Sequence, residues 1–339
     1  MHNNFIKHFI VTLIIFSNHS FGKEFEELFI INVPIENTSK IESSINESFN
    51  NLVFRISGSR SPSNIWKIIN SGSSRKDFIT SYSIKNFSEK SYLEVNFNQN
   101  LVIEKFKELS IPIVGYSRPV IFFLINVESG SGIPYYISQD SNNEIDILIK
   151  QTLNRLSNER GLFLELPFFD LDDKRYIADS SILKSPEQYF LSKYDFDEYV
   201  NIKLINLGLK KWFIKGDIKT DFNKEFYIED IKQSLDDYLE SLINITFSDL
   251  IIDTSKTVLL EVSIEGINSY EEYEILKEKL SKIIAITNFE ILNFKNDTIT
   301  YKINVMGDIS NFKKSIENNT FFEFLSEKNE NNLSLRFVK

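Results

Sequence analysis

The sequence contains no cysteine, two methionines, two tryptophans and three histidines among its 339 residues. All three histidines, His2, His8 and His19, lie within the first 22 residues. A chain without cysteine forms no disulfide bonds, so its stability has to come from a hydrophobic core. The length permits such a core, because chains of about 300 residues bury roughly three quarters of their unfolded surface.

The first 22 residues have the pattern of a secretory signal. Lys7 is the only charged side chain there, residues 9–16 (FIVTLIIF) are mostly apolar, and Ser20 and Gly22 occupy the small-residue positions of a cleavage site. The apolar run is shorter than the roughly 20 residues of a transmembrane helix. We therefore expect export to the periplasm with cleavage after Gly22, and a retained anchor is the alternative.

The predicted mature chain, residues 23–339, has neither histidine nor cysteine. Catalysis by Ser-His-Asp or Cys-His groups is impossible without them, and zinc sites almost always use one or the other. Carboxylate pairs, Ser-Lys dyads, tyrosines and oxygen-ligated Ca²⁺ or Mg²⁺ remain available. Because the residue that titrates near neutrality is missing, we expect a protein that is not an enzyme and that carries no cofactor or metal.

Acidic residues outnumber basic ones. Without Lys7, the 38 Lys and Arg become 37 against 48 Asp and Glu, which gives a net charge of −11. Nonspecific nucleic-acid binding requires clustered Lys and Arg facing phosphate. We expect no nucleic acid as a partner, and no membrane span after signal cleavage.

The two ends of the mature chain predict similar modules. Residues 23–116 and residues 256–339 each follow the order β-α-β-β-α-β of a ferredoxin-like unit. The first carries an insertion after its first helix and ends in the strand-like segment IPIVGY. In the second, a hairpin turns at Asn296-Asp297, and LSLRFV is expected as an edge strand.

Residues 117–255 predict a three-layer α/β domain between these modules. The segment PVIFFLINV is apolar almost throughout, as in a strand that is covered on both faces. A helix at 143–160 leads to the neighbouring strand LFLELPFF. YVNIKLINL and KKWFIKGDI then form a hairpin, and a last helix carries apolar residues from Ile231 to Leu242. The fold class is thus a multi-domain α+β and α/β protein.

Three aspartates follow the strand that ends at Pro167, namely Asp170, Asp172 and Asp173. Ligands bind outside the carboxyl ends of such strands, which makes these residues candidates for a ligand site. Their spacing lacks the glycine and the closing glutamate of a calcium loop, and basic residues follow them directly. We interpret them as a solvated loop, and a carboxylate-dependent hydrolase, with or without a divalent cation, is the alternative.

Two arginines are further candidates for ligand binding. Arg60 ends a Gly/Ser loop whose N–H groups can hold an anion, although we favour ordinary helix termination as the explanation for Gly58. Pro119 restricts Arg118 to extended backbone, and a buried guanidinium must find carboxylates or carbonyls. We predict that Arg118 pairs with Asp170 or Asp172 and clamps the first module onto the middle domain.

Four segments stand out in order: FRISGSR, LSIPIVGYSRPVIFFLINV, ERGLFLELPFFDLDD and KKWFIKG. Together they resemble the markers of an uncharacterised proteobacterial envelope family (domain of unknown function 2066), over about residues 28–219 and more loosely beyond. The matching positions are Arg55, Gly58, Gly115, Arg118, Pro119, Arg160, Gly161, Pro167, Asp170, Asp172 and Trp212. Tyr116 and Phe122 depart from the Trp-rich character of family members. The family has no established activity, so the resemblance implies only an exported protein of a Gram-negative bacterium.

These observations favour a non-enzymatic binding or scaffold protein of the periplasm, with another envelope protein as its partner. Small α/β modules of this kind often serve assembly, but that inference rests on fold analogy alone. The hydrolase alternative requires a deep pocket with convergent carboxylates.

Overall fold

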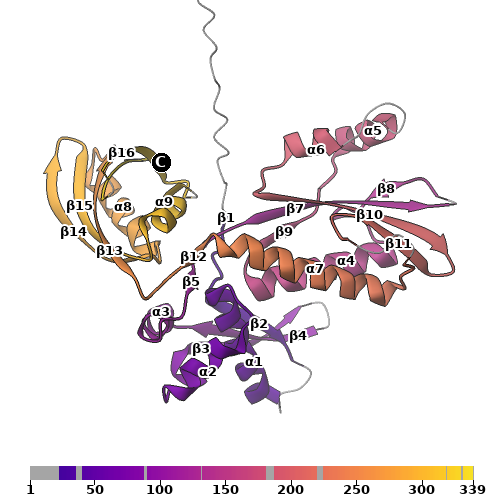
Figure 1. Ribbon diagram of the computed structural model, residues 1–339, viewed down its shortest axis with the longest axis horizontal. Helices are drawn as coiled ribbons and strands as arrows, with labels where there is room; N and C mark the ends of the chain where they lie inside the picture. The colour runs from indigo at the N-terminus through magenta and orange to yellow at the C-terminus, as the bar shows by residue number, and fades with distance from the viewer. Residues whose placement is uncertain are drawn as a thin grey trace, which may run out of the picture.

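The computed structural model describes residues 23–35, 40–87, 90–130, 132–180, 187–219, 224–317, 319–329 and 331–338, so the predicted signal segment lies outside the described residues. The protein is a mixed α/β structure, with nine α-helices and five sheets within these ranges. Figure 1 shows three parts that follow one another along the chain.

The N-terminal part is built on a three-stranded antiparallel sheet of order β2-β4-β3. Its elements are β2 (Ile30–Pro34), α1 (Ile41–Ser57), α2 (Pro62–Asn70), η2 (Arg75–Phe78), β3 (Ile79–Phe87), β4 (Lys90–Phe97) and α3 (Gln99–Glu108). The predicted apolar stripe of α1 is buried from Ile45 to Ile56. The predicted insertion consists of α2 and η2.

The last strand predicted for this part does not join its sheet. β5 (Ile113–Val114) pairs instead with β12 (Ile251–Ile252). Successive strand residues point to opposite sides, and accordingly Ile113 belongs to the core that the two terminal parts share, whereas Val114 belongs to the core of the middle part. The short strand therefore connects two cores rather than closing one sheet.

The middle part has a mixed sheet with β7 at its centre. β7 (Val120–Ser129) runs parallel to β10 (Glu198–Gly208) and to β9 (Phe163–Glu165), and it also pairs with β8 (Tyr135–Tyr136). β10 continues into β11 (Lys211–Gly216) as the predicted hairpin. Beside this sheet, β1 (Lys23–Glu24) pairs with β6 (Ser117–Arg118).

Helices cover both faces of this sheet (Figure 1). α4 (Glu144–Arg160) and α7 (Ile228–Ser248) pack on one face, and α5 (Leu171–Ser180) and α6 (Glu187–Lys193) lie on the other. Phe123 contributes to the core on the first face, and its neighbour Phe122 contributes to the core on the second. The apolar run of β7 thus follows from burial on both sides, as predicted.

The C-terminal part has a five-stranded sheet of order β14-β15-β13-β17-β16, which curves around two helices (Figure 1). Its elements are β13 (Thr257–Glu265), α8 (Tyr270–Lys282), β14 (Ile286–Lys295), β15 (Thr298–Met306), α9 (Ile309–Glu317), β16 (Phe322–Asn329) and β17 (Asn332–Phe337). The predicted turn at Asn296-Asp297 joins β14 to β15.

The segment LSLRFV was expected at an edge, and that expectation is wrong. It forms β17, which lies between β13 and β16 and runs parallel to β13. Leu333, Leu335 and Phe337 are buried there. The edge on this side of the sheet is β16, whose second half, SEKN, is exposed and polar. A polar strand tolerates an edge, where one row of backbone groups faces water.

Candidate functional site

Three buried arginines meet where the N-terminal part joins the middle part. They are Arg55 near the end of α1, Arg118 in β6 and Arg160 at the end of α4. Both helices end at a glycine in the left-handed conformation, Gly58 with φ 68° and Gly161 with φ 65°. Added Cβ atoms would come within 2.7 Å of Val114 and of Arg55, respectively. The two glycines thus permit the helix ends to approach closely.

The arginines bind the main-chain carbonyls at these helix ends. Arg55 donates to the carbonyl of Asn158 in α4, and Arg160 donates to the carbonyl of Gly58 after α1 at 2.8 Å. The last carbonyls of a helix lack partners within the helix and carry its negative dipole end. Each helix therefore supplies the cation that satisfies the other helix.

Arg118 connects both helix ends through its own guanidinium. It donates to the carbonyls of Arg55 at 3.1 Å and of Arg160 at 3.4 Å, and also to those of Val114 at 3.0 Å and Gly115 at 2.6 Å. The ring of Phe247 in α7 lies 5.2 Å from the guanidinium carbon. We call the set Arg55, Arg118 and Arg160 with these carbonyl partners the arginine junction.

Burial dominates the electrostatics of the arginine junction. It lowers the pKa of Arg118 well below its usual value, and the neighbouring charges of Arg55 and Arg160 lower it further. Burial also lowers the pKa of Arg55, to about 10, so this guanidinium stays charged at neutral pH. Burial lowers the pKa of Arg160 as well, and the ion pair with Glu240 of α7, at 2.6 Å, partly offsets this lowering.

The structure corrects the prediction for Arg118. The side chain is fully buried and links the first two parts of the chain, but the expected ion pair with Asp170 or Asp172 is wrong. Its hydrogen bonds within the described residues go to carbonyls, because two helix ends lie closer than the aspartates do. Arg60 lies at the rim of the junction, where it pairs with Glu159 and, at 2.9 Å, with Glu240.

The three aspartates do not form a solvated loop. They open α5, where the Asp170 carboxylate accepts hydrogen bonds from the N–H groups of Asp172 at 2.9 Å and Asp173 at 2.8 Å. The Asp173 side chain is fully buried and accepts from Lys193 of α6 at 2.7 Å and from the Tyr189 hydroxyl at 2.9 Å. Lys193 also pairs with Asp170 at 2.8 Å.

This α5–α6 lock, formed by Asp170, Asp173, Tyr189 and Lys193, is structural. Hydrogen bonds from Lys193 and from the helix backbone lower the pKa of Asp170 to about 2. The two carboxylates raise the pKa of Lys193 in turn. Asp172 stays exposed and lies 3.5 Å from Arg175. The carboxylates predicted as candidates for ligand binding therefore already accept hydrogen bonds or ion pairs from groups of the protein itself.

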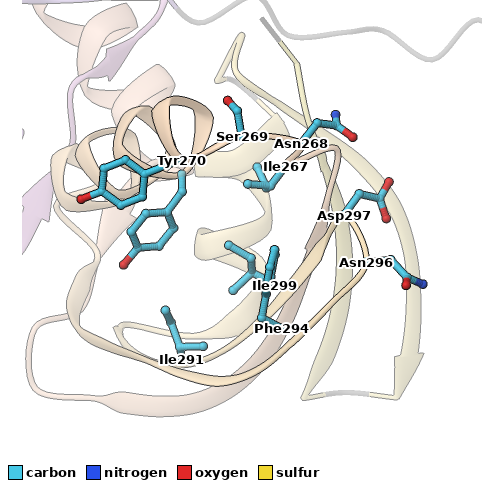
Figure 2. A pocket seen from close by; sticks show the side chains of 10 residues that line it. Ile267, Asn268, Ser269, Tyr270, Ile291, Phe294, Asn296, Asp297 and Ile299 are labelled. Atoms are coloured by element: carbon cyan, nitrogen blue, oxygen red, sulfur yellow. The ribbon is translucent and has the colours of Figure 1, made fainter.

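An apolar cavity of about 590 Å³ opens on the C-terminal part, between the start of α8 and the β14–β15 hairpin (Figure 2). The polar groups at its rim include Asn268 and Asp297. Tyr270 is 75% exposed and Phe294 is 59% exposed. The apolar lining consists of Ile267, Tyr270, Tyr273, Ile291, Phe294 and Ile299.

A bulge in β14 shapes this cavity. Ile291 pairs with Tyr301 and Phe294 pairs with Ile299, with Leu292 as an extra residue between them. A regular strand would send Ile291 and Phe294 to opposite faces; the extra residue puts both on the face of buried Tyr301 and Ile299. Sequence reasoning missed the site, although the broken alternation in NFEILNF was its signal.

A second hollow, of about 1010 Å³, lies at the carboxyl end of β7 and β10. The starts of α4 and α7 also line it, in the position where ligands of α/β sheets often bind. Side chains of the helices themselves cap both helix starts. Asp146 accepts a hydrogen bond from the N–H of Asn143, and Asp230 accepts one from the N–H of Tyr227, each at 2.9 Å. The apolar cavity of the C-terminal part is therefore the better candidate for a binding site.

Comparison with known proteins adds no family assignment, since no family model, curated protein or solved structure matches the chain. Within the described ranges, no helix has the length and apolar character to cross a membrane. In the same part of the chain, His, Cys, Asp and Glu form no group of three that could hold a metal ion.

Proposed function

We propose that this chain is an exported, non-enzymatic binding or scaffold protein of the Gram-negative envelope, and that it holds a partner at the apolar cavity of its C-terminal part. The observation that carries the proposal is the cavity itself. Its volume lies in the range of protein binding sites, and apolar walls with a few polar groups at the rim are typical of them.

The exposed apolar side chains around the cavity support binding to another protein. Ile291 and Phe294 of β14 are each about half exposed, and Tyr270, which lines the same cavity, is 75% exposed. A contiguous apolar patch of this kind on a protein surface marks an interaction site. The partner we propose is an envelope protein that inserts an apolar side chain between Tyr270 and Phe294.

The resemblance to the envelope family belongs to this proposal. Six of the positions that carry it, far apart in the sequence, take part in the arginine junction or in its immediate turns. They are Arg55, Gly58, Gly115, Arg118, Arg160 and Gly161. Residues that build one structural unit are expected to recur together in relatives, which supports the resemblance and, with the predicted signal, the periplasmic location.

We also propose that the two terminal parts are variants of one ferredoxin-like unit. The first three strands have the same relative order in both sheets, β2-β4-β3 and β13-β15-β14, and a helix follows the first and third strand of each. The N-terminal unit has lost its fourth strand from the sheet, and the C-terminal unit has a hairpin, β16–β17, in that place.

The hydrolase alternative has no support from the arrangement of its residues. Lys193 engages both Asp170 and Asp173, and Asp173 is fully buried. A general acid or nucleophile has to reach its substrate. These carboxylates face a lysine and a helix backbone instead.

Site-specific photo-crosslinking tests the proposed binding site. A photoreactive residue in place of Phe294, on the cavity, should form a discrete adduct with one envelope protein in living cells. The matched control replaces Tyr82 on β3, which is 54% exposed against 59% for Phe294. Adducts at both positions, or at neither, would contradict binding at the cavity.

A further inference from the structure

The two edges of the C-terminal sheet differ in chemistry. β16 ends in Ser-Glu-Lys-Asn, and Glu327 pairs with Lys313 of α9. β14 is a ten-residue strand with only Glu290 and Lys295 charged, and it exposes Ile291, Leu292 and Phe294. Charged side chains protect an edge from pairing with another chain, whereas a long apolar edge invites it.

We propose that β14 pairs with β14 of a second copy of this chain, antiparallel about a two-fold axis, so that two five-stranded sheets become one. The inference goes beyond the proposed function, because binding at the cavity does not require a dimer. A two-fold interface places the same surface of both copies in contact, so the surface has to complement itself.

The sequence of β14 has this property in one register. With the axis between Leu292 and Asn293, Glu290 lies opposite Lys295 of the partner subunit, and Ile291 lies opposite Phe294 of the partner subunit. Each contact occurs twice by symmetry. The register therefore combines two opposite-charge pairs with two apolar pairs, the cross-strand combinations that stabilise a sheet.

The bulge at Leu292 makes this register possible. Residues directly opposite each other on antiparallel strands have to point to the same face. The bulge places Ile291 and Phe294 together on the cavity face, opposite Tyr301 and Ile299, and Glu290 and Lys295 together on the other, opposite Lys302 and Thr298. In a regular strand both pairs would be split between faces.

Charge favours a second copy as the occupant. The whole chain has a net charge of −10, yet residues 286–295 have one Glu and one Lys and are neutral. A strand without net charge does not repel its own copy, whereas it offers no attraction to a strongly basic or acidic partner. In the dimer, the cavities of both copies open on the same face of the joined sheet.

Sedimentation of residues 23–339 tests the dimer. The wild type should be dimeric at micromolar concentration, and Glu290→Lys or Lys295→Glu should each weaken association about tenfold or more, because two attractive pairs become repulsive. The double variant Glu290→Lys/Lys295→Glu exchanges the charges and should restore the dimer. Lys328→Glu on the other edge, β16, is the matched control and should have no effect.

Two results would overturn the inference. One is a wild type that stays monomeric at about 100 μM, well above a micromolar dissociation constant. The other is a dimer that neither single charge reversal weakens. In both cases a crosslink from position 294 to an envelope protein would leave the proposed function standing, so the two proposals fail separately.

Discussion

The arginine junction and the α5–α6 lock both bury a charged side chain completely, yet they satisfy it differently. Arg118 is met by four main-chain carbonyls, and Asp173 is met by the ammonium group of Lys193 and a tyrosine hydroxyl. Carbonyls are permanent dipoles that do not titrate, whereas a carboxylate loses its charge in acid. The contacts of Arg118 therefore lose no charge in acid, whereas a contact made by a carboxylate does.

They also differ in how much of the molecule depends on them. The junction holds α1 of the N-terminal part against α4 of the middle part, and Arg160 of α4 in turn pairs with Glu240 of α7. The lock joins α5 to α6, two short helices on one face of the middle sheet. Damage to the junction should therefore be global, and damage to the lock should be local.

Removal of the Arg118 side chain should have the largest effect. Arg118→Ala leaves buried carbonyls at two helix ends without donors, and each such group costs about 1 kcal/mol or more. We expect the free energy of unfolding to fall by about 3 kcal/mol or more, measured by denaturant unfolding.

The matched control is Arg155→Ala on α4, five residues before Arg160 of the junction. Its side chain is 38% exposed and pairs with Glu159 and Asp236. Exposed pairs contribute under about 1 kcal/mol. Equal losses for the two variants would show that carbonyl binding in the junction has no special weight.

Removal of the Asp173 charge should have an intermediate and local effect. Asp173→Asn breaks a pair in which the carboxylate is buried and Lys193 is 33% exposed, so we expect a loss of about 1 to 3 kcal/mol. Hydrogen exchange should become faster in α5 and α6 and stay unchanged in α1.

Asp172→Asn is the control for the lock, because this side chain is 83% exposed and should change stability by under about 0.5 kcal/mol. A uniform increase of exchange over the whole middle part in Asp173→Asn would mean that the lock is not a local device.

The smallest effect we expect is that of acid, which should weaken the α5–α6 lock but not the contacts of Arg118. The pKa of Asp170 is about 2 in the folded protein against an ordinary 3.8, so the folded state binds fewer protons in this range. Its stabilising contribution is complete above about pH 4 and is lost as the pH falls through 2. Carbonyl-bound Arg118 has no such transition.

We therefore expect the amides at the start of α5 to lose protection between pH 4 and pH 2, before those at the end of α1. The measurement is hydrogen exchange at a series of pH values, corrected for intrinsic rates. Loss of protection at both places in parallel would contradict the assignment of different partners.

Sequence patterns predicted the elements that depend on near neighbours. The burial of β7 on both faces, the stripe on α1 and the turn at Asn296-Asp297 all follow from local periodicity or turn chemistry. The pairing of β5 with β12 and the position of β17 beside β13 depend on which distant strands pair with each other. A local sequence pattern carries no information about that choice, so neither pairing was predictable.

The candidate site was predictable only in part. Pro119 and the apolar run after it indicated that Arg118 is buried, but two of its four carbonyl partners come from segments 42 and 63 positions away. Lys193, the partner of Asp173, lies 20 positions further along the chain on another helix. The cavity depends on a single extra residue, Leu292. This residue breaks the alternation of apolar and polar side chains along β14, so a search for strictly alternating strands does not find the site.

The arginine junction also sets an order of events during folding. Arg55 donates to a carbonyl 103 positions later in the chain, and Arg160 donates to the carbonyl of Gly58, 102 positions earlier. Contacts between such distant segments form slowly, because the loop between them has to close first. Until α4 has been synthesised, the end of α1 therefore lacks both the Asn158 carbonyl that binds Arg55 and the Arg160 guanidinium that binds Gly58. An intermediate with such incomplete contacts exposes apolar surface, and surface of that kind is what chaperones recognise.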